Sequence, residues 1–134
     1  MIYKSLAKRA QAARKNSHSP YSRFRVGAAL LSKTGKIFTG CNIEISTFAL
    51  TICAERTAIF KAISEGSTKF RAIAIATDEN GFTPPCGACR QVLMDLAGNI
   101  DVIITNRRGE IREYKLEELF PFPFGAANLK KNRR

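Results

Sequence analysis

Three cysteines and one glutamate are the residues of this chain best suited to chemistry. Cys86 and Cys89 form a Cys-x-x-Cys pair directly after Pro85, and Cys53 and Glu55 form a Cys-x-Glu element upstream of it. Thiolates bind Zn²⁺ strongly, and a catalytic zinc site keeps three protein ligands and one position for water. A carboxylate beside such a site can move the protons of that water. The pattern predicts one zinc ion per chain, held by Cys53, Cys86 and Cys89, with Glu55 as the general acid and base of a hydrolytic reaction.

The cysteines also permit two other interpretations. A Cys-x-x-Cys pair alone could be a redox dithiol, although Cys53 and Glu55 count against this. Cys41 could complete a closed four-thiolate zinc site in a protein without catalytic activity. Cys41 lies in an apolar segment, however, where a buried free thiol is the ordinary explanation. His18, the only histidine of the sequence, lies among turn-forming residues, and we expect it to be exposed to solvent.

The elements that position these residues follow from hydrophobic periodicity. The pattern predicts helices over residues 2–16, 52–65 and 86–97, strands over 24–31, 36–41, 70–77, 101–105 and 111–114, and a helical turn at 116–119. Both cysteine groups then lie in the first turns of helices, where the positive end of the helix stabilises thiolate. Strands that alternate with helices indicate an α/β domain whose mixed sheet is covered on both sides. The two helix starts are expected at the same edge of that sheet.

Length and composition indicate one domain. The chain has 134 residues, of which 45% are hydrophobic, which is enough for one core and too short for two. We expect a catalytic domain over residues 1–129 and a basic tail over 130–134. No apolar run reaches the roughly 18 residues that a membrane span needs, and the amino terminus lacks the layout of a signal peptide. A cytoplasmic location is therefore expected, and three cysteines held as thiolates fit a reducing compartment.

The formal net charge of +11 is concentrated at the two ends of the chain. Residues 1–43 carry nine Lys and Arg and no acidic residue, and the tail adds four more basic residues. Residues 44–129 carry nine basic and eleven acidic residues. A basic helix and a basic tail are more often solvated surface than a docking stripe, so we expect neither nucleic acid nor membrane as a partner.

Four motifs connect the chain to a known family. Residues 21–30 (YSRFRVGAAL), 40–44 (GCNIE), 51–59 (TICAERTAI) and 85–93 (PCGACRQVL) resemble, in this order, the small homotetrameric cytidine deaminases. The resemblance runs from about residue 2 to 129 and includes the zinc-deaminase signature, with cysteine where other branches carry histidine. It implies a three-layer α/β/α sandwich with a mixed sheet of about five strands. It also implies deamination of cytidine and deoxycytidine by zinc-activated water in pyrimidine salvage, and assembly as a homotetramer.

The resemblance also implies the nucleoside contacts. Asn42 and Glu44 match the family's contacts to ribose hydroxyls, Phe24 its aromatic residue against the base, and the backbone around Ala54 its polar contact to the base. A carboxylate at Glu44 would also repel a 3′-phosphate, which favours free nucleoside over polynucleotide. Arg56 follows Glu55 directly and is a candidate donor to the cysteine sulfurs, the alternative being an exposed helix arginine.

Two further contacts are implied across subunits, and here the chain departs from the family. Relatives commonly read Asn-Ile-Glu-Asn-Ala and then tyrosine, whereas this chain has Ile45, Ser46 and then Phe48. This segment reaches toward a neighbouring subunit in the family. Phe124, in the aromatic ending LFPFPFG, aligns with the aromatic that the family lends to a neighbour's base. The altered segment leaves open deamination of a cytosine-nucleoside antibiotic of the blasticidin type, and the basic ends leave open a polynucleotide or tRNA base deaminase.

Overall fold

The computed structural model describes residues 2–130, and their order of elements follows the predicted alternation of strands and helices. Five helices and one short 3₁₀ helix lie around five strands within this range. The helices are α1 (Ile2–Arg14), η1 (Phe48–Leu50), α2 (Ala54–Ser64), α3 (Gly87–Ala97), α4 (Leu116–Leu119) and α5 (Ala126–Lys130); the strands are β1 (Val26–Ser32), β2 (Ile37–Cys41), β3 (Phe70–Thr77), β4 (Asp101–Thr105) and β5 (Ile111–Lys115). No described helix is long and apolar enough to cross a membrane.

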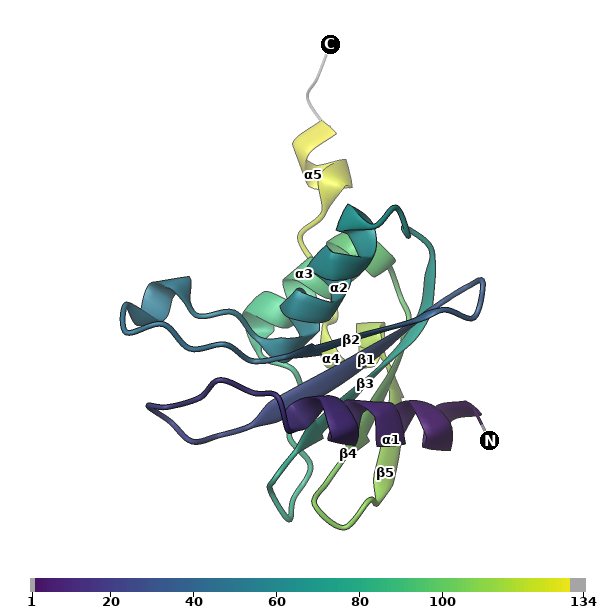
Figure 1. Ribbon diagram of the computed structural model, residues 1–134. Helices are drawn as coiled ribbons and strands as arrows, with labels where there is room; N and C mark the ends of the chain where they lie inside the picture. The colour runs from purple at the N-terminus through teal and green to yellow at the C-terminus, as the bar shows by residue number, and fades with distance from the viewer. Residues whose placement is uncertain (1, 131–134) are drawn as a thin grey trace.

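The strands form one mixed sheet in the order β2-β1-β3-β4-β5. β3 pairs antiparallel with β1 and parallel with β4, so it lies at the centre. The β1–β2 and β4–β5 hairpins form the two antiparallel edges. α1 lies across one face of this sheet, and α2 and α3 lie on the other face (Figure 1). The predicted three-layer α/β/α sandwich with a five-stranded mixed sheet is confirmed.

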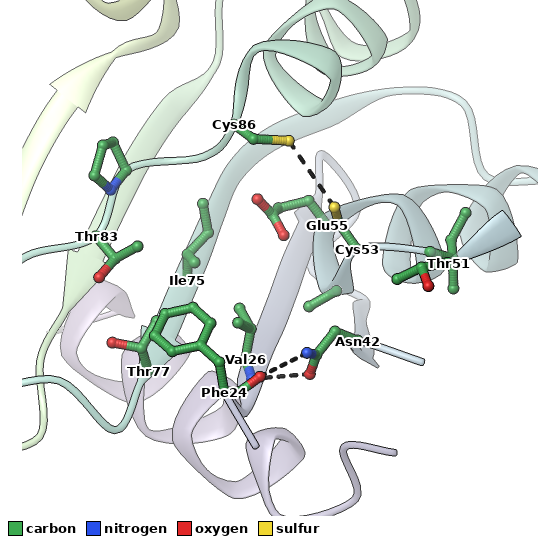
Figure 2. Close-up of a pocket in the computed structure, with 13 residues that line it drawn as sticks. Phe24, Val26, Asn42, Thr51, Cys53, Glu55, Ile75, Thr77, Thr83 and Cys86 are labelled. Atoms are coloured by element: carbon green, nitrogen blue, oxygen red, sulfur yellow. Dashed lines mark hydrogen bonds between the residues drawn. The ribbon is translucent and has the colours of Figure 1, made fainter. Parts of the chain in front are cut away.

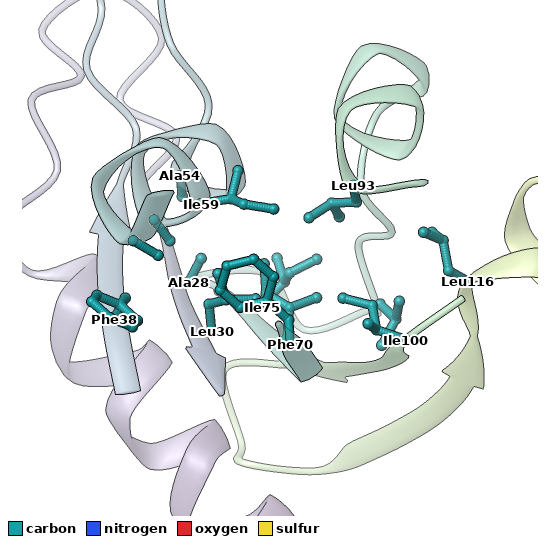
Figure 3. Packing of buried hydrophobic residues seen from close by; sticks show 14 of the residues in the cluster. Ala28, Leu30, Phe38, Ala54, Ile59, Phe70, Ile75, Leu93, Ile100 and Leu116 are labelled. Atoms are coloured by element: carbon teal, nitrogen blue, oxygen red, sulfur yellow. The ribbon is translucent and has the colours of Figure 1, made fainter. Parts of the chain in front are cut away.

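Two apolar cores hold the three layers together, because alternate residues of a strand point to opposite faces. On the α2 and α3 side, Ala28 and Leu30 of β1 and Ile73 and Ile75 of β3 meet the helices (Figure 3). On the α1 side, the intervening residues pack against the helix: Ala29, Leu31, Ala72, Ala74, Ala76 and Ile103 against Leu6, Ala7 and Ala10. Small residues fill most of the α1 core, so this helix lies close to the sheet.

Gly27 and Gly40 permit close approaches between helix and sheet. A Cβ atom at Gly40 would lie 2.6 Å from the carbonyl oxygen of Ala54 and 2.6 Å from the amide nitrogen of Ala58. Non-bonded heavy atoms do not approach so closely, so only glycine fits where the first turns of α2 cross β2. At Gly27, a Cβ atom would collide with the backbone of Ala10 and Arg14 in α1.

The boundaries differ from the prediction mainly where a residue caps an element. Cys53 and Cys86 are extended residues that precede α2 and α3, with ψ angles of 157° and 166°. The expected helices over 52–65 and 86–97 therefore begin one or two residues later. The strand expected from residue 24 begins at Val26, because Phe24 belongs to the preceding loop. The short helix α5 was not expected. Its last residue is Lys130, the first residue of the expected basic tail. Residues 131–134 of that tail lie outside the described part.

Candidate metal centre and active site

The cysteines of the two motifs converge where α2 and α3 begin. Sγ of Cys53 lies 3.9 Å from Sγ of Cys86, and the sulfur atoms of Cys53, Cys86 and Cys89 all lie within 4.8 Å of one another. Cys89 is buried, Cys53 is half-buried and Cys86 is exposed. Cys41 is half-buried and lies outside this cluster. The four-thiolate site with Cys41 is therefore excluded for the described geometry.

The spacing of the sulfur atoms fits a zinc ion. Tetrahedral zinc with Zn–S bonds of about 2.3 Å separates its sulfur ligands by about 3.8 Å, close to the 3.9 Å between Cys53 and Cys86. Within residues 2–130 the cluster contains three sulfur donors and no fourth protein ligand, which matches a catalytic site with one open position. Cys53 and Cys86 immediately precede the first residues of their helices, so both residues lie at the positive ends of helices.

Arg56 contacts the sulfur cluster directly. Its Nη2 donates to Sγ of Cys53 at 3.3 Å, which agrees with the prediction of a donor and excludes an exposed helix arginine. A hydrogen bond from Cys89 and, next in size, the one from Arg56 lower the pKa of Cys53 to about 5, although burial opposes the shift. The same pairing and burial raise the pKa of Cys89. Cys53 thus ionises more easily than Cys89.

Glu55 carries a buried carboxyl group beside this cluster. The residue is 4% exposed, and its carboxyl group points into a cavity next to the sulfur atoms of Cys53 and Cys86 (Figure 2). Burial raises the pKa of Glu55 to about 7, and the nearby Cys53 adds to the shift. No basic side chain forms an ion pair with Glu55 among the described residues. The group can therefore hold or release a proton near neutral pH.

The cavity in front of Glu55 has the size and lining of a small-molecule site. Its volume is about 210 Å³. An apolar part of the wall suits a flat ring, and a polar part offers thiol, hydroxyl, amide and carboxyl groups. The apolar residues are Phe24, Val26, Ile52, Ala54, Ile75 and Pro84, and the polar ones are Asn42, Thr51, Cys53, Glu55, Thr77, Thr83 and Cys86.

Sequence and structure comparisons identify the family of proteins that share this site. The family described as the cytidine and deoxycytidylate deaminase zinc-binding region matches residues 2–105. The chain belongs to this deaminase family. It is 45% identical to a cytidine deaminase of Sporosarcina psychrophila over 130 residues, covering 96% of each chain. It is 48% identical to that of Halalkalibacterium halodurans over 125 residues, covering 92% of this chain and 95% of the relative.

A solved structure agrees with the sequence matches. The crystal structure of cytidine deaminase from Burkholderia pseudomallei superimposes with a TM-score of 0.89 at 42% identity, covering 92% of this chain and 100% of that one. A Blasticidin-S deaminase of Bacillus cereus is more distant, with 33% identity over 111 residues and coverage of 77% and 79%. The deaminase family and the three-cysteine cluster together establish zinc as the cofactor of this site.

Asn42, which is expected to bind ribose, also forms hydrogen bonds that hold neighbouring segments of the chain together. Oδ1 of Asn42 accepts hydrogen bonds from Ser17 Oγ and Val26 N, and Nδ2 donates to the carbonyl oxygen of Phe24 at 2.7 Å. One N–H of the Asn42 amide remains without a partner within the described residues. Asn42 therefore fixes the start of β1 and still has a donor at the cavity wall.

Glu44 holds the loop that precedes Phe24 and does not line the cavity. Its carboxylate accepts hydrogen bonds from the backbone amides of Tyr21 and Ser22 at 3.0 and 3.1 Å and from the Ser22 hydroxyl. The Ser22 hydroxyl is the main reason that the pKa of Glu44 is lowered. A carboxylate has about four acceptor positions, so one stays available for a ligand hydroxyl.

The remaining predicted residues divide into two groups. Phe24 and Ala54 line the cavity, and Ala54 is the first residue of α2, so its backbone N–H has no acceptor within the helix. Phe48 and Phe124 lie away from the cavity and are 65% and 55% exposed. The Phe48 ring contacts Tyr21 edge-on. Within one chain, the structure therefore brings neither Phe48 nor Phe124 to the site.

Three contributors to the site were missed by reasoning from the sequence. Thr83 and Thr77 line the cavity with hydroxyl groups, and Ser22 positions Glu44. Thr83 stands three residues before Cys86, so its closeness to the cysteine motif was the available signal. The placement of Thr77 at the end of β3 and the pairing of Ser22 with Glu44 depend on tertiary structure and have no signal in the local pattern.

Proposed function

We propose that the protein hydrolyses cytidine and deoxycytidine to uridine, deoxyuridine and ammonia, and so serves pyrimidine salvage. Water adds to C4 of the pyrimidine, the bond between C4 and the exocyclic nitrogen breaks, and the amine leaves as ammonia. The observation that carries the proposal is a buried carboxyl group, Glu55, next to three clustered cysteine sulfurs in the wall of a partly apolar cavity. The cytidine deaminases among the relatives support the same substrate.

Glu55 is the residue that moves protons in this reaction. The zinc ion supplies Lewis-acid activation of the attacking water. Glu55 accepts a proton as water attacks, delivers it to N3 of the ring and transfers a second proton to the departing amine. Its position in the cavity wall beside Cys53 and Cys86 supports this role. Arg56 moderates the negative charge of three thiolates through its hydrogen bond to Cys53.

The substrate contacts that we propose combine packing and hydrogen bonding. The Phe24 ring packs on the pyrimidine, and the free N–H of Ala54 binds its polar edge. Asn42 uses its remaining N–H, and Glu44 its remaining acceptor position, for the ribose hydroxyls. Support for these roles comes from the unused donor and acceptor capacity and from the cavity wall, to which Phe24, Ala54 and Asn42 belong.

We place the enzyme in the cytoplasm as a homotetramer in which Phe48 and Phe124 complete the sites of neighbouring subunits. Both rings are exposed, and Leu50 and Phe122 nearby in the chain are 68% and 100% exposed, more apolar surface than single residues on a monomer usually present. Subunit assembly would bury these side chains. Light scattering tests the assembly, and an active monomer would contradict both the tetramer and the shared site.

A direct assay separates the candidate substrates. We expect deamination of cytidine and deoxycytidine, and little activity on a blasticidin-type nucleoside or a single-stranded oligonucleotide, in parallel reactions. The more distant similarity to Blasticidin-S deaminase makes the antibiotic the first alternative to test. Preference for the antibiotic or the oligonucleotide would overturn the substrate assignment and leave the zinc centre in place.

The metal ligands are tested independently of activity. Elemental analysis of Cys53→Ser should show loss of zinc, whereas Cys41→Ser should keep one zinc per chain, because Cys41 lies outside the cluster. The reverse pattern would contradict the ligand assignment.

A further inference from the structure

A second hollow, outside the active site, is lined by charged side chains alone. Its lining consists of Arg14, Arg25, Arg107 and Asp78. They come from four segments: the end of α1, the loop before β1, the turn between β4 and β5, and the residue after β3. Four separate segments that converge on one charged hollow differ from a run of basic residues along a helix, which is the usual form of a solvated surface.

This hollow lies beside the end of α1, next to the start of β1 and the end of β3, and shares no lining residue with the cavity that contains Glu55. Phe24 and Val26 line that cavity, whereas Arg25 between them lines the hollow. Thr77 lines the cavity as well, whereas Asp78 after it lines the hollow. Arg14 is the last residue of α1. The two sites therefore have separate linings, although their residues are neighbours in the chain.

The charges in the hollow are unbalanced. Asp78 accepts from Nε and Nη2 of Arg25 at 2.8 and 3.2 Å, and Arg14 Nη1 lies 3.0 Å from it. Three guanidinium groups face one carboxylate, which leaves an excess of two positive charges. Each guanidinium has about five N–H donors, so most of these donors remain available. Arg14 is 16% exposed, and its Nε is buried without a hydrogen-bond partner in the described structure.

We propose that Arg14, Arg25 and Arg107, with Asp78 between them, form a binding site for a phosphate dianion, either free phosphate or the terminal phosphate of a nucleotide. Guanidinium groups recognise phosphate oxygens through paired N–H donors. A phosphate ester carries a charge of about −1.5 to −2 at neutral pH, which matches the excess in the hollow. Asp78 holds Arg14 and Arg25 side by side, so the donors are oriented before the anion arrives.

The position of the site predicts communication with the substrate cavity. Arg25 lies between Phe24 and Val26, and Asp78 follows Thr77, so each charged residue shares a backbone segment with part of the cavity wall. An anion that holds the Arg25 guanidinium also restrains its neighbour Phe24. The phosphate site contains none of the residues that we propose for deamination. A failure of the binding test would therefore leave the proposed substrate unaffected.

Isothermal titration calorimetry tests the site in chloride buffer at constant ionic strength. We expect inorganic phosphate to bind at one site per chain. Arg107→Ala should weaken this binding about tenfold, the size expected for one charge-assisted contact. Arg108→Ala, in the same turn and also exposed, is the matched control and should bind phosphate like the parent. Arg107 and Arg108 are both exposed, so both variants should fold, which circular dichroism verifies.

Titrations with adenosine 5′-phosphate and with adenosine distinguish the source of the phosphate. Tighter binding of the nucleotide than of inorganic phosphate identifies a nucleotide ligand, and equal binding identifies free phosphate. Three results would overturn the proposal. These are no saturable binding of either ligand near a Kd of about 1 mM, equal loss of affinity in the Arg107 and Arg108 variants, and binding of adenosine as tight as that of its 5′-phosphate.

Discussion

Replacing Glu55 by glutamine keeps the shape of the side chain and removes its ability to accept a proton. We expect Glu55→Gln to bind zinc and to fold, but to lose turnover by a factor of about 10² to 10⁴, the usual contribution of a general acid and base. Steady-state kinetics with cytidine and elemental analysis of zinc check this. Glu65→Gln, at the exposed end of α2, serves as the control. A Glu55→Gln enzyme within tenfold of the parent would show that another group carries the proton.

Arg56 affects the metal through one sulfur atom. Its hydrogen bond to Cys53 Sγ at 3.3 Å stabilises the thiolate, and partners of metal ligands typically change metal affinity by about 10- to 100-fold. Arg56→Lys should therefore release zinc faster to a coloured chelator. Arg71→Lys, on an exposed position of β3, should release zinc at the parent rate. Equal rates in the two variants would contradict the role of Arg56.

At the scale of elements, Gly40 controls how closely α2 approaches the sheet. A methyl group there would lie 2.6 Å from backbone atoms of Ala54 and Ala58. Gly40→Ala should therefore push the first turn of α2 outward and cost about 1–3 kcal/mol of unfolding free energy, as overpacking does. Urea unfolding measures this, with Gly81→Ala as the control because no atom lies within 4 Å of its added Cβ. Equal stability of the two variants would show that α2 tolerates the shift.

Asp78 links α1, β1 and β3, and its contribution to stability should depend on pH. Hydrogen bonds from Arg25, and the charges of Arg14 and Arg107, lower the pKa of Asp78 below its unfolded value. A lowered carboxyl pKa stabilises the fold above the unfolded pKa of about 3.9, and this contribution is lost as pH falls through the folded pKa.

Asp78→Asn should consequently lower stability at neutral pH and matter little in acid. Because the ion pairs are partly exposed, we expect a loss of about 0.5–1 kcal/mol at pH 7. The difference from the parent should shrink as pH falls below about 4. Urea titrations in phosphate-free buffer measure this difference in stability. Asp95→Asn, at an exposed position of α3, is the control. A difference that grows in acid would contradict the assigned ion pairs.

Much of the fold and of the metal centre could be predicted from the sequence, because both are encoded in short stretches of it. Apolar runs indicate the strands, and the short spacings between cysteines and Glu55 indicate the metal centre. Strands over residues 70–77 and 101–105 were predicted with the observed bounds, and the Cys-x-Glu and Cys-x-x-Cys spacings led to the cysteine cluster. Gly40 was not recognised, since only the crossing of α2 over β2 gives it a role. The arginine hollow was missed for the same reason. α5 is too short for periodicity to reveal it.

At the scale of the whole molecule, the uneven charge permits a test of the substrate. An uncharged nucleoside releases no counterions when it binds, whereas a polynucleotide releases many, so its affinity falls steeply with salt. We expect cytidine turnover to depend weakly on salt and to stay nearly unchanged when residues 130–134 are removed. Cytidine 3′-phosphate should be a poor substrate, because its phosphate would lie close to Glu44. Salt-sensitive deamination of an oligonucleotide that requires the tail would overturn the nucleoside assignment.

The order of the strands also determines the order in which the protein can mature during synthesis. β1 pairs with β3, Leu30 opposite Ile73, and Cys53 lies in the segment that this pairing closes. Cys86 and Cys89 follow β3 in the chain, so they leave the ribosome after Cys53 has been held in place by the first half of the sheet. The nascent chain therefore carries Cys53 for some time without the two cysteines that complete the cluster. Metal delivery can be completed only when α3 emerges, which leaves the Cys53 thiol open to oxidation in that interval.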